Sequence, residues 1–133
     1  MAVFNSKVNP RSESFNRNRR EMLELIEKLE ELNGRGAEVS EKRKPRFDAR
    51  GQLTPRERLA RLLDPGMPFL HIGNLSGYLL DTKNPEKSIP GSTVIAGIGF
   101  IYGARCMIVV DDSGIMAGSM TAAGGYKIRR AEE

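Results

Sequence analysis

The feature that most limits how this sequence can fold is an apolar stretch from Thr93 to Val110. Side chains alternate across a strand, so this stretch would present two apolar sets on opposite faces. The sets are Val94, Ala96, Ile98 and Phe100 on one face, and Ile95, Gly97, Gly99 and Ile101 on the other. A strand that is apolar on both faces is typical of the interior of a covered sheet. The two glycines would leave a groove for close packing of another backbone.

A hairpin is expected within this stretch. Glycine in the first central position suits a two-residue turn, which predicts a turn at Gly103-Ala104 and an antiparallel return from Cys106 to Val110. Cys106 is the single cysteine of the chain, which excludes an internal disulfide and a cysteine-based metal cluster. Because its neighbour Arg105 points to the opposite face, Cys106 is interpreted as a small core residue, and no metal site is predicted.

The residues before this stretch favour helices. Apolar residues recur at steps of three and four from Asn16 to Leu32, which predicts an amphipathic helix that ends at Asn33-Gly34 and needs a partner surface. A second helix is predicted after Thr54, which would cap it, with Pro55 first in the helix and Glu57 reaching back to the cap amide.

The segment after the second predicted helix contains a signal that ends the helix, followed by a short strand and a loop. Asp64-Pro65-Gly66 would end the helix. Pro68 to Ile72 reads as a short strand that contains His71, the only histidine. A lone histidine without a nearby acidic or cysteine cluster favours a structural role. Residues 73–90 are rich in turn formers and predict an exposed loop.

Charge and length narrow the function classes. The 133 residues carry a net charge of +4, and no apolar run approaches the roughly 20 residues that span a bilayer. The absence of an apolar block near the N-terminus argues against a signal peptide, so the predicted location is the cytoplasm, or the mitochondrial matrix in a eukaryote. A reducing compartment also fits the single cysteine.

The basic excess lies in residues 1–62, which hold 15 of the 21 Lys and Arg but only 10 of the 17 Asp and Glu. Its densest part, Glu41 to Arg46, is open to two interpretations. It is a solvated linker between helices, or it contacts the phosphates of nucleic acid or a nuclear import receptor. No aromatic residues interleave with it for base stacking, which favours the linker. A small basic adaptor or nucleic-acid-binding domain remains the alternative function.

The chain leaves the second strand through Asp111-Asp112-Ser113-Gly114 and Gly118 before a final helix. Backbone amides at such a bend can converge on an anion, and Lys127, Arg129 and Arg130 follow. A phosphate-binding site and a flexible exit loop are both compatible with this pattern. An acid/base pair of Asp111 and Asp112 is disfavoured, because adjacent side chains on a strand point to opposite faces.

Two blocks carry a resemblance to a known family: LTPRERLARLLDPGMPFLHIGNLSGY, from Leu53 to Tyr78, and GIGFIYGARCMIVVDD, from Gly97 to Asp112. They resemble the N-terminal region of the carboxyltransferase (β) subunit of biotin-dependent acyl-CoA carboxylases of the methylcrotonyl-, geranyl- and propionyl-CoA type. The resemblance implies an α/β fold, the start of a crotonase-like β-β-α superhelix after N-terminal helices. Composition and periodicity predict a disordered terminus at 1–13 and a helical arm at 14–64. The resemblance implies the start of the carboxyltransferase domain at 65–133, cut within its final helix.

The resemblance also implies a function. The family transfers a carboxyl group from carboxybiotin, carried by a biotin carboxylase or carrier subunit, to an acyl-CoA through an enolate, in a homo-oligomer. The CoA-binding residues implied are Gly118, Lys127 and Arg130. No catalytic residue is expected here, since Asp112-Ser113-Gly114 only echoes the family's oxyanion turn and aligns with the segment before it. The piece alone is therefore expected to be inactive.

One departure from the family lies at the bend. Met116-Ala117-Gly118 replaces the usual Lys-Gly-Gly, which removes one positive charge and one glycine near the acyl-CoA pocket. This departure leaves the identity of the substrate open, and the activity as well.

Overall fold

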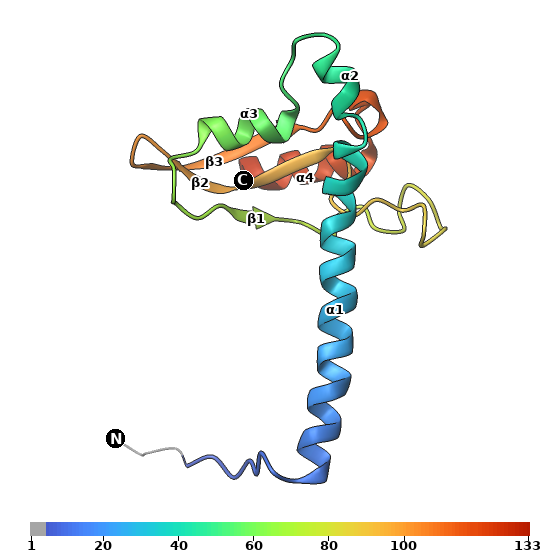
Figure 1. The fold of residues 1–133 in the computed structure, drawn as a ribbon, viewed down its shortest axis with the longest axis vertical. Helices are drawn as coiled ribbons and strands as arrows, with labels where there is room; N and C mark the ends of the chain where they lie inside the picture. Colours follow the sequence, from blue (N-terminus) through green and yellow to red (C-terminus); the bar gives the residue numbers. More distant parts are fainter. Residues whose placement is uncertain (1–4) are drawn as a thin grey trace. The chain divides into compact units, whose positions relative to one another are not determined.

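The computed structural model of the chain describes residues 5–133 and divides it into two compact units, Met1–Glu31 and Leu32–Glu133. Its elements, shown in Figure 1, are α1 (Glu13–Glu41), α2 (Lys44–Asp48), α3 (Pro55–Leu62), β1 (Leu70–Ile72), β2 (Val94–Ile101), β3 (Ala104–Asp111), η1 (Met116–Gly118) and α4 (Ala122–Glu132). This mixture of helix and sheet confirms the predicted α/β class. Within residues 5–133 there is no helix long and apolar enough to cross a membrane.

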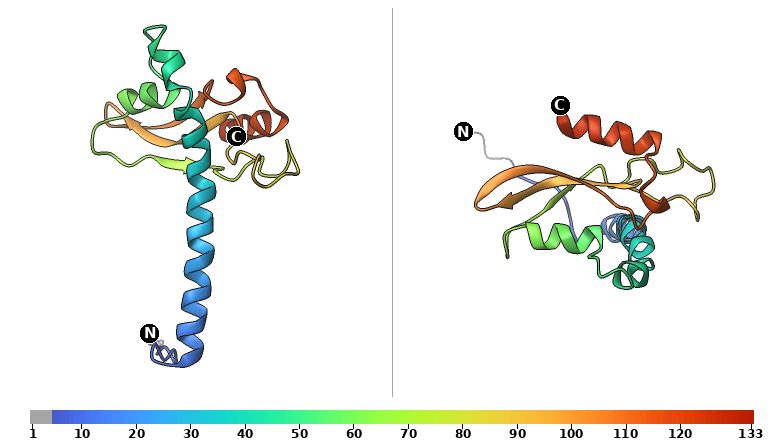
Figure 2. Two further views of the ribbon diagram at one scale, coloured as in Figure 1. Left: turned by 45° about the vertical axis from the view of Figure 1, so that its right-hand side comes forward. Right: turned by 90° about the horizontal axis from the view of Figure 1, so that it is seen from above.

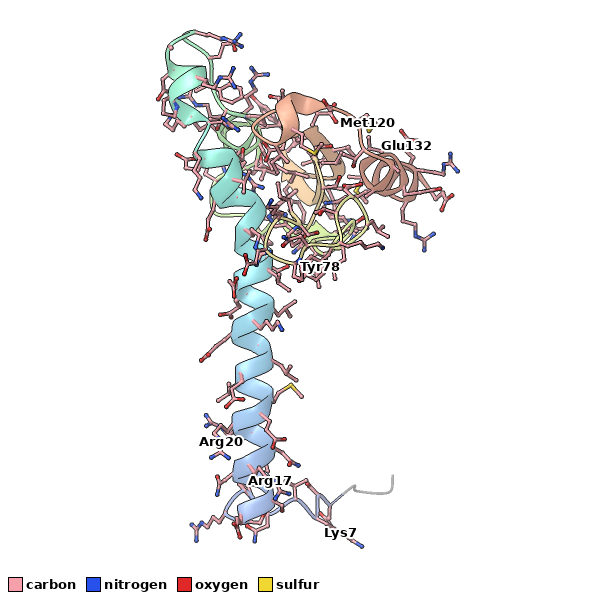
Figure 3. The ribbon with its side chains drawn as sticks, turned by 90° about the vertical axis from the view of Figure 1, so that its right-hand side faces the viewer. Lys7, Arg17, Arg20, Tyr78, Met120 and Glu132 are labelled. Atoms are coloured by element: carbon pink, nitrogen blue, oxygen red, sulfur yellow. The ribbon has the colours of Figure 1, made fainter. Side chains whose placement is uncertain are left out.

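The first unit holds the N-terminal part of α1. Ser12 precedes the helix, and its Oγ accepts a hydrogen bond of 3.2 Å from the Phe15 amide, as an N-cap does. The labelled Arg17 and Arg20 lie on this part of the helix (Figure 3). The predicted apolar stripe is present and open to solvent, with exposures of 41–62% for Met22, Leu25, Ile26 and Leu29.

The predicted end of this helix at Asn33-Gly34 is wrong, because α1 continues to Glu41. In the second unit, a Cβ on Gly36 would lie 3.1 Å from the Pro90 carbonyl oxygen, so the helix backbone packs closely there. Ser40 is 1% exposed and its hydroxyl donates to the Asp112 carboxylate. These tertiary contacts outweigh the roughly 1 kcal/mol by which a glycine weakens a helix.

The sheet of the second unit is antiparallel in the order β1-β2-β3, which places β2 in the interior as predicted. The hairpin turn, however, lies one residue earlier than predicted. Ile101 pairs with Ala104, so Tyr102 and Gly103 form the turn, with φ of 52° and 75°. The Asp64 carboxylate accepts hydrogen bonds of 2.7 Å from both turn amides, which compensates for a tyrosine in a left-handed conformation.

The two faces of the sheet are covered by different helices, α3 on one side and α4 on the other (Figure 2). The α3 face forms the main core of Leu59, Ile95 and Ile108, against which Leu63, Phe69, Ile101, Cys106 and Val110 pack. The predicted core role of Cys106 is confirmed. The α4 face is less covered, since Met107 and Val109 of β3 are 44% and 39% exposed.

The predicted groove at Gly97 and Gly99 exists, and a side chain occupies it. A Cβ on Gly97 would lie 2.5 Å from Cζ of Phe69 and 2.6 Å from the Leu70 carbonyl oxygen. A Cβ on Gly99 would collide with Leu63. The two glycines therefore allow the Phe69 ring and the β1 backbone to approach β2 closely.

Two other expectations needed correction. The first strand is shorter than predicted, at Leu70–Ile72. The segment 73–90 has no helix or strand, as predicted, but it is not wholly exposed. Ser88 is 1% exposed, and its Oγ accepts a hydrogen bond of 2.8 Å from the Leu79 amide. The loop is thus fastened by its own polar side chain.

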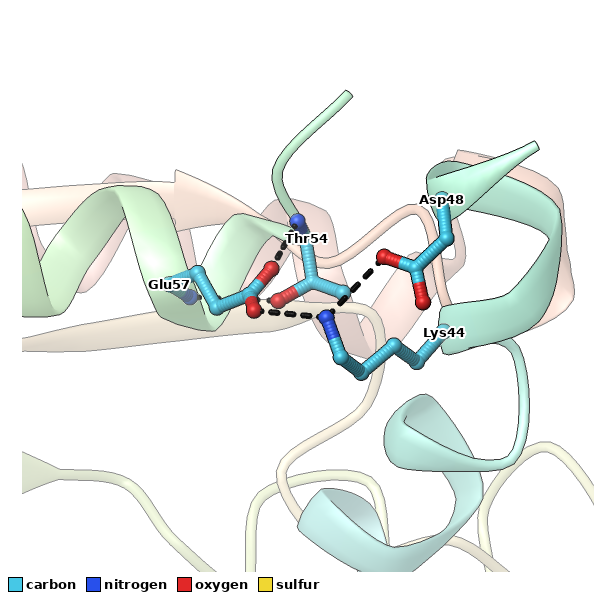
Figure 4. A network of polar contacts seen from close by, with 4 residues as sticks. All are labelled: Lys44, Asp48, Thr54 and Glu57. Carbon is cyan, nitrogen blue, oxygen red and sulfur yellow. Dashed lines mark hydrogen bonds and ion pairs between the residues drawn. The ribbon is translucent and has the colours of Figure 1, made fainter. Parts of the chain in front are cut away.

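The predicted capping box of α3 is confirmed and extended (Figure 4). Thr54 Oγ1 accepts from the Glu57 amide at 3.1 Å, and the Glu57 carboxylate accepts from the Thr54 amide at 2.8 Å. Lys44 Nζ lies 2.7 Å from Glu57 and 3.0 Å from Asp48. The hydrogen bond to Lys44 holds the pKa of Glu57 at about 2, and those to Glu57 and Asp48 raise the pKa of Lys44 to about 12. The predicted linker therefore runs into α2, whose Lys44 is bonded to α3.

Substitution of Gly97 by alanine should lower the free energy of unfolding by about 1–3 kcal/mol, because the added methyl group would clash with Phe69 and the Leu70 carbonyl. Gly125→Ala is the matched control, since nothing lies within 4 Å of the position its Cβ would take in α4. There alanine should stabilise the protein by about 0.5–1 kcal/mol. Urea unfolding of both variants measures the two effects, and equal stabilities would contradict the close packing of β1 on β2.

Candidate functional site

The exit from β3 is built around a fully buried carboxylate, that of Asp112, which is 0% exposed. Its Oδ1 accepts hydrogen bonds of 2.6 Å from Ser40 Oγ and 3.1 Å from the Gly114 amide. Its own amide donates to the Thr93 carbonyl at 2.8 Å. The side chain thus joins the end of α1 to the bend that leaves the sheet.

The partner charge of Asp112 comes from α3. Arg56 Nε lies 3.2 Å from Asp112 Oδ2, although the two atoms lack the alignment of a hydrogen bond. A buried carboxylate needs an opposite charge, because desolvation of an unpaired ion costs several kcal/mol. Of the three arginines of α3, Arg56 alone is partly buried, with a side chain 31% exposed, whereas Arg58 and Arg61 are exposed.

A second buried charge lies on α4. Lys127 is 7% exposed, and its Nζ donates to the carbonyl oxygens of Val94 at 2.6 Å and Gly91 at 3.3 Å. Burial, with a smaller effect of the Arg56 charge, lowers the pKa of Lys127 to about 8. Arg56, Asp112 and Lys127 line one cavity of about 260 Å³.

His71 lies on the wall of the same cavity. Its ring contacts Phe69 edge to face, with centroids 4.7 Å apart. Burial, and then the charges of Arg56 and Lys127, lower the pKa of His71. The ring contact supports the predicted structural role.

The bend itself contains consecutive left-handed residues. Met116, Ala117 and Gly118 have φ of 46°, 54° and 79°. A left-handed conformation costs a residue with a side chain about 1–2 kcal/mol. Glycine, which the family resemblance predicts at position 117, would avoid this cost. In this chain Ala117 adopts the left-handed conformation with its methyl group in place.

Beside the bend lies the larger cavity, of about 480 Å³. Four arginines line it, together with residues of the bend. They are Arg43, Arg46, Arg50 and Arg58, facing Ser113, Gly114, Met116 and Ala117. Several arginines around one cavity favour the binding of an anion.

The structure gives the three predicted CoA-binding residues different surroundings. Gly118 ends η1 at the bend. The Lys127 side chain extends from α4 to the backbone carbonyl oxygens of Gly91 and Val94. Arg130 is exposed and its Nη1 lies 3.0 Å from the Glu133 carboxylate. Their role in CoA binding stays a prediction.

Sequence reasoning missed the two features that organise this region. The buried role of Asp112 depends on Ser40, which lies 72 positions away, so no local pattern reports it. The arginine-lined cavity was partly visible as the basic run that ends at Arg46. Its other members, Arg50 and Arg58, join it only through the packing of α2 and α3.

Substitution of one member of the Asp112–Arg56 ion pair should lower the free energy of unfolding. Asp112→Asn is expected to cost about 2 kcal/mol or more, because Arg56 then lacks its partner. The double variant with Arg56→Met should cost less than the sum of the single variants, with a coupling of about 1–3 kcal/mol. Asp111→Asn is the neighbouring exposed control and should stay within about 0.5 kcal/mol. Additive losses in a urea-unfolding cycle would contradict the ion pair.

Lys127 should make stability depend on pH. Its pKa is about 8 in the folded protein, against 10.5 for an ordinary lysine. Between these values the unfolded chain holds more protons, so stability should rise with pH across pH 8–10.5. Comparison with Lys127→Met isolates this slope, and Lys87→Met controls for the loss of an exposed positive charge. Parallel curves for wild type and Lys127→Met would contradict the burial of a charged amine.

Comparisons with known proteins agree on a family. The carboxyl transferase domain family matches residues 46–133. The probable methylcrotonoyl-CoA carboxylase beta chain of Drosophila melanogaster, a mitochondrial protein by its name, is 32% identical over 98% of this chain and 22% of its own length. The chain thus spans about a fifth of the length of that relative.

Solved structures give the same result. The β subunit of geranyl-CoA carboxylase from P. aeruginosa is 38% identical and superposes with a TM-score of 0.87 over 98% of this chain and 24% of its own. The transcarboxylase 12S structure, whose description names a hexamer assembly and bound methylmalonyl-coenzyme A, is 25% identical with a TM-score of 0.61 over 85% of this chain and 22% of its own. The crotonase-like fold and the predicted family are confirmed, and the chain belongs to the carboxyl transferase domain family of the biotin-dependent acyl-CoA carboxylase β subunits.

Proposed function

We propose that this chain forms part of an enzyme that transfers a carboxyl group from carboxybiotin to an acyl-CoA. The observation that carries the proposal is the superposition of 98% of the chain on a geranyl-CoA carboxylase β subunit at 38% identity. The chain supplies the first strands and helices of the domain, so its own contribution is to support and shape the acyl-CoA site.

The chemistry requires a carbon next to the thioester carbonyl to become nucleophilic, with hydrogen-bond donors placed at the developing enolate oxygen. The described residues contribute the bend after β3, whose shape is set by Asp112 and its contact with Ser40. We assign no donor of this chain to the enolate oxygen. Biotin is carried by a partner subunit in this proposal, as in the family resemblance, and acyl-CoA is the substrate.

The proposed partners are those that the family resemblance implies. A biotin carboxylase or biotin carrier subunit delivers the carboxyl group, and copies of this protein form a homo-oligomer. The hexamer named for transcarboxylase 12S supports the second point. The exposed stripe of α1, Met22 to Leu29, supplies apolar surface for contact with another subunit. In a eukaryotic cell the protein would work in mitochondria, as the name of the Drosophila relative states for that protein.

The predicted residues for CoA are Gly118, Lys127 and Arg130. In this proposal Lys127 acts on the site indirectly, because its amine already donates to the carbonyl oxygens of Gly91 and Val94. Met116 and Ala117, in place of the family's Lys and Gly, alter the bend beside the substrate. The preferred acyl group therefore has to be measured.

Carboxylation assays test the proposal. The protein, in the form that the cell makes, is combined with its biotin-carrying partner, ATP and ¹⁴C-bicarbonate. Acid-stable label should appear on one of methylcrotonyl-, geranyl- or propionyl-CoA, and avidin should abolish it. Absence of avidin-sensitive label on all three, with a partner shown to be carboxylated, would overturn the proposal.

A further inference from the structure

The ion pair of Arg56 and Asp112 leaves two buried polar atoms with hydrogen-bonding capacity that the protein does not use. Nε of Arg56 and Oδ2 of Asp112 lie 3.2 Å apart, and neither makes a hydrogen bond within residues 5–133. Buried polar atoms of native proteins almost always have a hydrogen-bond partner, and an exception commonly marks a bound water or ion. The pair therefore points to a ligand that offers an acceptor to Arg56 and a donor to Asp112.

The cavity beside this pair carries an excess of positive charge. Arg56, Lys127 and the ring of His71 lie around a volume of about 260 Å³, and the only carboxylate in its lining is that of Asp112. Burial is the main reason why the pKa values of His71 and Lys127 are lowered, and the charge of Arg56 lowers both further. Asp112 therefore does not cancel the field of Arg56 inside the cavity.

The two cationic side chains also have donors to spare. Lys127 Nζ donates to the carbonyl oxygens of Gly91 and Val94, so a further N–H of this amine has no partner among the described residues. The terminal nitrogens of Arg56 make no hydrogen bond in the part of the chain that the structure describes. The lining thus offers charged donors from α3 and α4 to an acceptor in the cavity.

A small planar monoanion with a hydroxyl group fits these properties. A guanidinium group can donate two parallel hydrogen bonds to two oxygens of a planar anion. A single negative charge offsets the excess of Arg56 and Lys127 over Asp112, and a hydroxyl group supplies the donor that Oδ2 of Asp112 lacks. The cavity of about 260 Å³ has room for such an ion, since a water molecule takes about 30 Å³ in the liquid. Bicarbonate has all of these properties.

We propose that this cavity binds bicarbonate, with its charged oxygens toward Arg56 and Lys127 and its hydroxyl group donating to Asp112. The ion would connect α3, α4 and the residue after β3, and so stabilise the second unit. The proposal is independent of the function proposed above, because it gives bicarbonate a place in the fold and no part in carboxyl transfer. Inorganic phosphate also combines charged oxygens with a hydroxyl group and is the competing source of the ligand.

Titration of the intact protein with ¹³C-bicarbonate, followed by ¹³C NMR at constant ionic strength, measures the affinity. Competition by nitrate and by inorganic phosphate then gives their affinities for the same site. Nitrate is the matched ligand, because it is planar and singly charged like bicarbonate but has no hydrogen to donate. Bicarbonate should bind about tenfold more tightly than nitrate or better, because nitrate leaves the buried Oδ2 of Asp112 without a donor.

Two variants locate the site. Asp112→Asn exchanges an acceptor for an amide that can donate, so the preference for bicarbonate over nitrate should disappear. Asp111→Asn, at the exposed neighbour, should keep it. Lys127→Met keeps a chain of similar length, tests the site even if Asp112→Asn does not fold, and should weaken bicarbonate binding severalfold. Its control is Lys87→Met, because Lys87 is exposed and does not line this cavity.

The results decide the proposal as follows. A preference for bicarbonate that is lost in Asp112→Asn or weakened in Lys127→Met, and kept in both controls, would uphold it. Equal affinities for bicarbonate and nitrate would overturn it, and so would tighter binding of phosphate than of bicarbonate. Bicarbonate binding that neither Asp112→Asn nor Lys127→Met changes would place the ion elsewhere and reject this site. Failure of bicarbonate to bind at all would leave water as the partner of Arg56 and Asp112 and would also overturn the proposal.

Discussion

The second unit depends on one buried charge, that of Asp112. Its carboxylate accepts from Ser40 and Gly114 and lies beside Arg56. The end of α1, the start of α3 and the exit from β3 thereby meet at one side chain. A fully buried carboxylate tolerates little movement of its partners, because each lost contact would leave an ion in a medium that solvates it poorly. The shape of the bend follows from this constraint.

The bend separates two cavities of different character. On one side are Arg56, Asp112 and Lys127, whose charged groups contact one another or the backbone. On the other side are four arginines with no ion pair or side-chain hydrogen bond within residues 5–133, in a lining that includes Ser113 and Gly114. The charged residues of the first cavity stabilise the fold, and the arginines of the second are suited to bind an anion. Met116 and Ala117 of the bend have left-handed backbone conformations. Such strained conformations are common at functional sites.

Local chemistry made much of this fold predictable. The alternation within Val94 to Ile101 identified the central strand, and the Thr54–Glu57 pair identified the start of α3, because both signals lie within a few residues. Long-range contacts decided the remainder. Gly34 did not end α1, since Gly36 and Ser40 pack farther along the same helix. The turn moved to Tyr102 because Asp64, 38 positions away, binds its amide. The arginine cavity was hidden for the same reason.

The hydrogen bonds between Asp64 and the hairpin turn bear on the order in which the second unit folds. The pairing of β2 with β3 needs only neighbouring residues, and hairpins of this kind close within about 1–10 μs. Asp64 also donates its amide to the Phe100 carbonyl at 2.8 Å, so its contacts with β2 and with the turn are complete only when the hairpin is in place. Folding in which the β2–β3 hairpin forms first and the residues after α3 bind to its turn afterwards has a low entropic cost. The short loop of the hairpin then closes before the longer loop between Asp64 and Tyr102.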